Sequence, residues 1–117
     1  MRGIVADANV EGHVEYLVNR IVAGDWLPYW NHMGIVLESF ANIGLVDRSP
    51  DDMVWRTCQS ERLVLITANR NHDGANSLEA TIVSEGTDAS LPVFTIANAD
   101  RVMLEGEYAE RVIARLI

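Results

Sequence analysis

The chain contains no lysine, and all nine of its basic residues are arginines. Seventeen aspartates and glutamates outnumber them and give a formal net charge of −8 at pH 7. A protein that binds nucleic acid or anionic lipid through surface charge alone needs a basic excess, so the composition disfavours both classes. It does not exclude an enzyme that handles nucleic acid through a bound metal ion.

Cysteine and long hydrophobic runs are also scarce. The single Cys58 cannot form an internal disulfide, which disfavours a disulfide-stapled secreted scaffold and favours a reducing compartment. No apolar run approaches the roughly 20 residues of a membrane span, and Asp7 comes too early for the hydrophobic stretch of a signal peptide. We therefore expect a cytoplasmic protein that does not contact membranes, with a single domain over residues 1–117.

Apolar periodicity predicts strands that alternate with helices. Residues 63–67 form the clearest strand because the run Leu-Val-Leu-Ile-Thr is continuous and rich in β-branched side chains. Such alternation predicts an α/β fold, a three-layer α/β/α sandwich around a parallel sheet of about four strands. The expected strands are 3–6, a stretch within 35–40, 63–67 and 92–96; the expected helices are 14–22, 50–61, 77–84 and 107–116, with a loop or short helix at 25–30.

Polar residues follow the predicted strands at the edge where parallel sheets bind ligands. They are Asp7 and Asn9 after the first strand, Asp51 and Asp52 at the start of the second helix, Asn69, Asn71 and Asp73 after the third strand, and Glu79 at the start of the next helix. Carboxylates that converge there repel one another unless a cation lies between them. Oxygen ligands with few histidines favour Mg²⁺ or Mn²⁺.

Each of these residues also has a purely structural interpretation. Asp7 is a candidate cap for the following helix, and Asp51 and Asp52 favour the dipole of a helix whose N-cap we predict to be Ser49. The Asn-rich stretch is typical of a turn, and Glu79 fits an exposed helix position. Arg70, together with Arg56, flanks the predicted site and is a candidate phosphate contact.

Two familiar folds with this alternation are excluded by missing residues. A receiver domain needs a lysine near the end of its last strand, and this chain has none; its third strand also ends in Thr67-Ala68-Asn69, without an aspartate to phosphorylate. A flavodoxin needs a phosphate loop rich in Ser, Thr and Gly after the first strand, and that loop is absent. Neither Gly-rich nucleotide-binding motif occurs.

Two stretches resemble the PIN nuclease superfamily. Ala6-Asp7-Ala8-Asn9-Val10 resembles the opening D-x-N motif of that superfamily. Ser49-Pro50-Asp51-Asp52-Met53-Val54-Trp55, followed by 63–69, is similar to the later core of small PIN-like families related to bacterial toxin ribonucleases. Asn69 stands where the family usually has the aspartate of T-x-D, and Asn71 replaces an acidic residue often found two places later. The resemblance covers about residues 3–98.

The resemblance implies a Mg²⁺- or Mn²⁺-dependent endoribonuclease, a hydrolase with Asp7, Asp51 and Asn69 as catalytic residues. Asp7, Asp51 and Asp73 would bind the metal, supported by Asn9, Asp52, Arg70, Asn71 and Glu79. It also implies RNA as substrate and an antitoxin-like protein as partner, as in toxin–antitoxin pairs. The alternative hypothesis is a PIN-like binding or oligomerisation module without catalysis, for instance a homodimer that uses an aromatic patch of Trp26, Tyr29 and Trp30.

Overall fold

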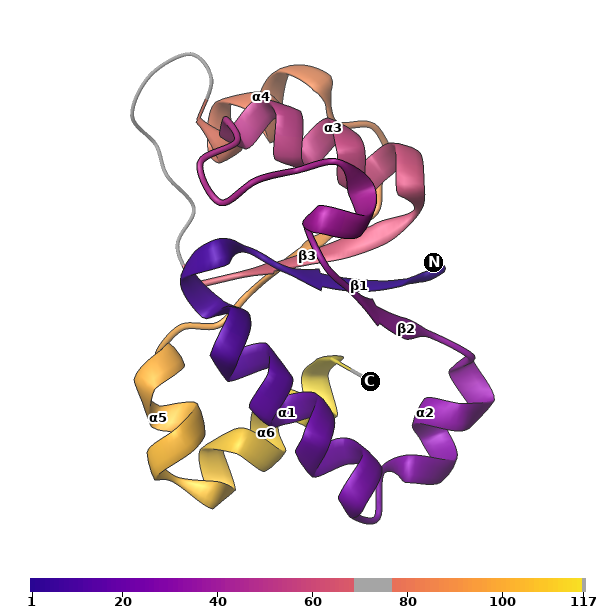
Figure 1. Cartoon of the computed structure of the whole chain (residues 1–117), viewed down its shortest axis with the longest axis vertical. Helices are drawn as coiled ribbons and strands as arrows, with labels where there is room; N and C mark the ends of the chain where they lie inside the picture. The colour runs from indigo at the N-terminus through magenta and orange to yellow at the C-terminus, as the bar shows by residue number, and fades with distance from the viewer. Residues whose placement is uncertain (69–76, 117) are drawn as a thin grey trace.

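The computed structural model describes residues 1–68 and 77–116 of the chain. These residues form one sheet of four strands: β1 (Gly3–Ala6), β2 (Val36–Glu38), β3 (Leu63–Thr67) and β4 (Val93–Thr95). The strands are parallel throughout, and their order across the sheet is β2-β1-β3-β4 (Figure 1). The predicted α/β class with a parallel sheet of about four strands is confirmed.

Helices cover both faces of the sheet in the described part of the chain (Figure 1). One face packs against α1 (Glu11–Ala23), α5 (Ala99–Leu104) and α6 (Gly106–Leu116), with α2 (Leu27–Met33) beside them. The other face packs against α3 (Asp51–Glu61) and α4 (Leu78–Glu85). Two short 3₁₀ turns, Ala8–Val10 and Ala41–Ile43, follow β1 and β2. The result is a three-layer sandwich.

The alternation of side chains along the strands creates two separate cores. Ile4 and Ile66 point to the layer of α1 and α6, where both are fully buried. Val5 and Leu65 point to the opposite layer and pack with Trp55 of α3. This is the period-two pattern of a strand that is buried on both faces. Asp7 and Thr67 continue the same alternation and therefore belong to the side of α3.

The start of α3 differs in detail from the prediction. Pro50 occupies the N-cap position instead of the first helical position, and the helix begins at Asp51. Ser49 does not cap the helix, because its hydroxyl accepts a hydrogen bond from the backbone N–H of Val46 at 2.9 Å. The serine closes the preceding turn, so the interpretation of Ser49 as N-cap was wrong. The helix itself and its end at Glu61 are as predicted.

Other departures concern short or exposed segments. Helix α5 was not predicted: its Val102 is fully buried, but Met103 and Leu104 beside it are 51% and 82% exposed, which leaves no apolar period to detect. In the predicted helices 14–22 and 77–84, Val22 and Val83 are 40% and 77% exposed, so neither side chain belongs to the core. The aromatic stretch near Trp26 forms the last turn before α2 and the first part of that helix.

None of the helices in residues 1–68 and 77–116 is long and apolar enough to cross a membrane. The longer ones, such as α1 with 13 residues, carry charged side chains on their outer faces. This finding agrees with the expectation that the protein has no membrane-spanning segment.

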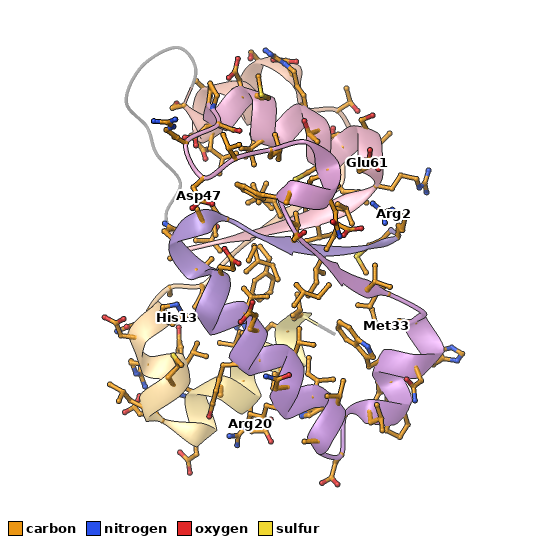
Figure 2. The ribbon with its side chains drawn as sticks, viewed as in Figure 1. Arg2, His13, Arg20, Met33, Asp47 and Glu61 are labelled. Carbon is orange, nitrogen blue, oxygen red and sulfur yellow. The ribbon has the colours of Figure 1, made fainter. Side chains whose placement is uncertain are left out.

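Ion pairs hold the N-terminal end of β1 against its neighbours. Arg2 donates to a carboxylate oxygen of Glu61 at 3.3 Å and to Glu38 at 3.0 Å (Figure 2). Both pairs are exposed, and exposed pairs contribute at most about 1 kcal/mol each. They fix the direction of the side chains more than they stabilise the fold.

Candidate functional site

Asp7 stands at the point where the strand order reverses. The chain steps from β1 to β2 on one side and then crosses to β3 on the other, so the switch point lies between β1 and β3. Asp7 directly follows β1, and its N–H donates to the carbonyl of Ile66 in β3 at 2.8 Å. Ligands of open α/β sheets bind outside the carboxyl ends of the strands at this position.

Both carboxylate oxygens of Asp7 accept a hydrogen bond from the protein. Oδ1 accepts from the N–H of Ala8 at 2.8 Å, which caps the 3₁₀ turn. Oδ2 accepts from the hydroxyl of Thr67 at 3.2 Å, and Thr67 is itself fully buried at the end of β3. Asp7 therefore caps the 3₁₀ turn, whereas the N-cap of α1 is Val10, which makes no side-chain cap bond. The bond to Thr67 additionally fixes the carboxylate across the switch point.

The surroundings of Asp7 disfavour its negative charge. Burial raises the pKa of the Asp7 carboxyl above its ordinary value of 3.8, and the nearby charge of Asp51 raises it further. The hydrogen bonds from Ala8 and Thr67 lower the pKa without cancelling the effect of burial. A half-buried carboxylate of this kind is stabilised by a cation that replaces the lost water.

Asp51 is the second carboxylate of the site. It is the first residue of α3, and its Oδ2 accepts a hydrogen bond from the N–H of Leu78, the first residue of α4, at 3.2 Å. Ser77 caps the same end of α4 through a bond from the N–H of Ala80 to its hydroxyl. The amino ends of α3 and α4 thus meet at Asp51, which remains half-buried.

Asp52 turns away from Asp51. One oxygen of Asp52 accepts from Arg56 at 3.1 Å, and the same guanidinium also binds both carboxylate oxygens of Glu85. Arg56 is therefore committed to two exposed carboxylates on the outer side of α3. Asp52 and Arg56 belong to this surface network, and the hydrogen bonds show no link from it to Asp7.

Of the remaining predicted residues, two lie in the described part of the chain and four do not. Asn9 is exposed in the 3₁₀ turn after Asp7, and Glu79 is half-buried in the first turn of α4. Asn69, Arg70, Asn71 and Asp73 lie outside the described residues. Within 1–68 and 77–116, no three Asp, Glu, His or Cys side chains are grouped closely enough to hold a metal ion. The described donors are thus the two carboxylates of Asp7 and Asp51.

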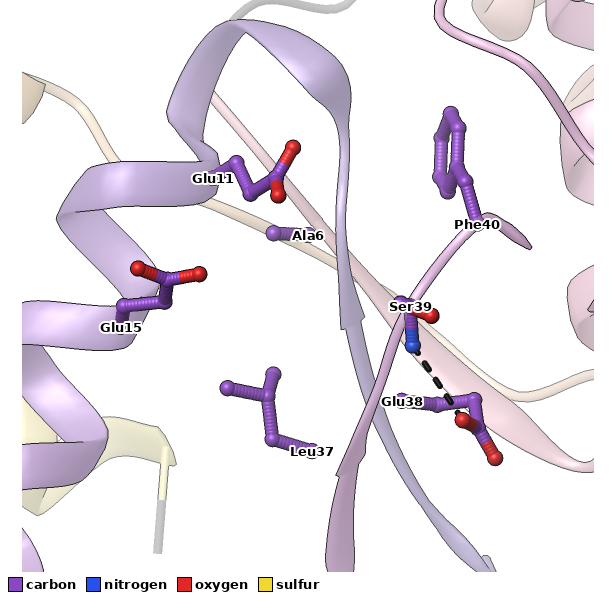
Figure 3. Close-up of a pocket in the computed structure, with 7 residues that line it drawn as sticks. All are labelled: Ala6, Glu11, Glu15, Leu37, Glu38, Ser39 and Phe40. Carbon is purple, nitrogen blue, oxygen red and sulfur yellow. Dashed lines mark hydrogen bonds between the residues drawn. The ribbon is translucent and has the colours of Figure 1, made fainter. Parts of the chain in front are cut away.

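An acidic cavity adjoins the end of β1 and was not predicted. It has a volume of about 180 Å³ and is lined by Glu11 and Glu15 of α1, by Glu38, and by the residue before Asp7, Ala6 (Figure 3). Glu11 also lines a second cavity of about 420 Å³ that reaches Asp47, just before α3. The sequence signal was the position of Glu11 in the first turn after Asp7.

In the described part of the chain, Cys58 and His13 are the thiol and imidazole considered as catalytic groups, and neither has the surroundings of one. Burial raises the pKa of the Cys58 thiol to about 12, and the charge of Asp7 adds to this effect. A thiol in that state is protonated at neutral pH and does not act as a nucleophile. His13 lies 3.7 Å from Asp100 of α5, on the far side of α1. Cys58 is a buried core residue on the side of α3.

In comparisons with protein-family models, curated proteins and solved structures, the chain has no match. The resemblance to PIN nucleases consequently depends on the motifs around Asp7, Asp51 and Thr67 alone. The fold and the placement of these residues provide the physical basis for assigning a function.

Proposed function

We propose that the protein is a Mg²⁺- or Mn²⁺-dependent ribonuclease of the PIN-like type. The observation that carries the proposal is the position of Asp7 at the switch point of the sheet, held there by Thr67 of β3 and half-buried, so that burial and, to a lesser extent, the charge of Asp51 raise the pKa of its carboxyl. A carboxylate whose charge is disfavoured in this way favours a bound cation.

The residues present fit such a cation. Mg²⁺ in phosphoryl-transfer sites is commonly held by one or two carboxylates, with water and substrate phosphate as the other ligands. The carboxylate oxygens of Asp7 each accept one hydrogen bond and keep a further lone pair, and Asp51 likewise has oxygen lone pairs left. When bound, the ion supplies Lewis acidity to a phosphodiester and lowers the pKa of water.

The chain itself positions the acidic groups. Thr67 holds Asp7 from β3, and the N–H of Leu78 holds Asp51 from α4, so neither carboxylate needs to reorient when substrate arrives. In the proposed site Asn69 orients water and Asp73 completes the ligand set, as the resemblance implies; Asn9, Arg70, Asn71 and Glu79 are supporting residues. Asp52 is left out of this set, because its carboxylate binds Arg56 on the outer side of α3. A cytoplasmic toxin-like ribonuclease with an antitoxin-like partner is the corresponding biological proposal.

The acid pair can be tested with two neighbouring aspartates. RNA cleavage in Mn²⁺ or Mg²⁺ should be abolished by EDTA, and Asp51→Asn should lower its rate by roughly tenfold to a hundredfold, because one of two charged ligands is lost. Asp52→Asn is the matched control. Its carboxylate binds Arg56 instead of the site, so this variant should cleave at close to the wild-type rate.

Activity that persists in EDTA would contradict the proposal. Equal losses of cleavage rate in Asp51→Asn and Asp52→Asn would also contradict it, because the loss would then come from the total negative charge at the start of α3 and not from a metal ligand. Circular dichroism of both variants checks that α3 still forms.

A second candidate function is a binding module that uses an aromatic surface on α2. Tyr29 is 58% exposed, and its ring lies 5.8 Å from that of Trp26, whose indole N–H is fixed by Glu110 of α6 at 3.1 Å. Rigid, exposed aromatics are typical of interaction surfaces. Titration calorimetry with Mn²⁺ separates the two candidates: binding at micromolar concentration or tighter supports the nuclease, and its absence supports the module.

A further inference from the structure

A groove lies along the outer edge of the sheet, between β4 and α6. Its volume is about 300 Å³, and its lining includes Phe94, Ile96, Tyr108, Arg111, Val112 and Arg115. This size is at the lower end of small-molecule sites. The groove is separate from the acid pair, because Phe94 and Ile96 point to the layer of α6 whereas Asp7 belongs to the side of α3.

The charge of the groove is opposite to that of the molecule. Arg111 and Arg115 are four residues apart, hence on one face of α6, and both are exposed. Neither forms an ion pair with another residue of the described ranges 1–68 and 77–116, and no carboxylate from these ranges lines the groove. Two unneutralised guanidinium groups in a protein with a net charge of −8 mark a local site for an anion.

Aromatic rings form the wall beside these arginines. The guanidinium carbon of Arg111 lies 5.7 Å from the centroid of the Tyr108 ring, within the range of a cation–π contact. The Tyr108 hydroxyl accepts a hydrogen bond from the N–H of Asn98 at 3.0 Å, which fixes the ring. Phe94 is half-buried beside them. A cation next to a flat apolar surface is complementary to a phosphate joined to a base.

The groove is connected to the acid pair through β3. The N–H of Ile96 donates to the carbonyl of Thr67 at 2.8 Å, and the hydroxyl of Thr67 donates to Asp7. Two strand spacings, roughly 10 Å, separate the backbone of Ile96 from that of Asp7. If an extended nucleic-acid strand binds in the groove, its neighbouring nucleotides therefore lie at the carboxyl ends of the β-strands, where the two carboxylates also lie.

We propose that the groove between β4 and α6 binds a nucleotide unit of single-stranded RNA, with its phosphate at Arg111 and Arg115 and its base against Phe94. The preference for a phosphate and a base follows from the groove alone. The choice of RNA as the source of the nucleotide depends on the proposed ribonuclease function. The net negative charge of the protein disfavours binding to nucleic acid, and the two arginines of this groove provide a local cationic contact.

The test is the binding of a fluorescein-labelled oligo(A) RNA to the whole protein, measured by fluorescence anisotropy in EDTA so that no cleavage occurs. Arg111→Gln and Arg115→Gln should each weaken binding by about tenfold. Each should also reduce the slope of log affinity against log salt by about 0.7, the value for one phosphate contact with a single strand. Arg62→Gln is the matched control, because this exposed arginine precedes β3 at the amino ends of the strands, whereas Ile96 of the groove follows β4 at their carboxyl ends. It should change neither quantity.

Phe94→Leu separates the base from the phosphate. It should weaken binding by about tenfold through lost stacking and leave the salt slope unchanged. AMP should displace the RNA at lower concentration than inorganic phosphate does. A melting curve checks that Phe94→Leu is folded; if it is not, the arginine variants and the two competitors still decide the outcome.

Affinity that is unchanged in both arginine variants, or reduced equally by Arg62→Gln, overturns the proposal. Displacement by inorganic phosphate as effective as that by AMP also overturns it, because the base would then contribute nothing. Asp7→Asn should bind the RNA as the wild type does. Loss of cleavage and loss of groove binding are thus distinguishable failures.

Discussion

Asp7→Asn is expected to lower the rate of metal-dependent RNA cleavage by at least about a hundredfold. Asparagine has the shape of aspartate and keeps an oxygen that can accept the hydrogen bond from Ala8. Its amide can donate to the hydroxyl oxygen of Thr67, so the local geometry is retained. The variant loses only the negative charge at the switch point. Cleavage is measured on single-stranded RNA in Mn²⁺, with an EDTA blank.

The same variant should be more stable than the wild type at neutral pH. The pKa of Asp7 is higher in the folded protein than in the unfolded chain, so the protonated carboxyl favours folding. This stabilisation is full below the ordinary pKa of 3.8 and is lost as the pH rises through the folded-state pKa. At pH 7 the wild type carries this penalty and the asparagine variant does not. Thermal melts followed by circular dichroism should therefore show a higher Tm for the variant at pH 7, and the difference should diminish below pH 3.8.

Metal dependence supplies the control for this prediction. Mn²⁺ should raise the Tm of the wild type, because a ligand that binds only the folded state stabilises it, and should have little effect on Asp7→Asn. Cleavage that survives the substitution would contradict the assignment of Asp7 as a metal ligand. A Tm that falls at pH 7 would contradict the interpretation of Asp7 as a penalised charge.

Gly3→Ala is expected to destabilise the fold by about 2–3 kcal/mol. Gly3 pairs with Val36 in the parallel ladder between β1 and β2, and a Cβ at this glycine would overlap the backbone carbonyl oxygen of Val36. Backbone cannot swing aside as a flexible side chain does, so β2 must move away from β1. Urea denaturation measures the change in the free energy of unfolding.

Gly12→Ala is the matched control for this substitution. Gly12 lies on the exposed side of α1, and a Cβ there would meet no atom within 4 Å. Alanine is the better helix former, so this variant should be more stable by roughly 0.5 kcal/mol. Equal effects of the two substitutions would show that the close approach at Gly3 has no energetic consequence.

The sequence predicted the elements that have a strong local pattern. The continuous run of β3 and the Pro-Asp-Asp start of α3 each carry a signal within a few residues. The structure places β3 where expected and starts α3 one residue later, at Asp51. The order β2-β1-β3-β4 has no such local signal, because it depends on which strands pair across the whole chain. Helix α5 was missed for a related reason: one fully buried side chain, Val102, shows no period.

The sequence predicted which types of residue form the candidate site, but it did not predict which contacts those residues make. Asp51 and Asp52 are equivalent by composition, since both are acids in a first helical turn. The turn of the helix separates them: Asp52 meets Arg56 four residues along the same helix, whereas Asp51 binds the N–H of Leu78, a tertiary contact that the sequence does not show. The groove beside α6 was missed because Arg111 and Arg115 form it together with Phe94, and the sequence does not show that this distant strand packs beside α6.

The parallel ladders also have a consequence for the way the chain folds. Gly3 pairs with Leu63 and Leu65 with Val93, so every contact between strands closes a long loop. Folds dominated by such distant contacts fold slowly compared with helical bundles. During synthesis β1 can pair with β2 early, but it must wait for β3 before its second edge is covered. The bond between Thr67 and Asp7 can therefore form only after β3 has been synthesised, and the candidate site forms no earlier than that.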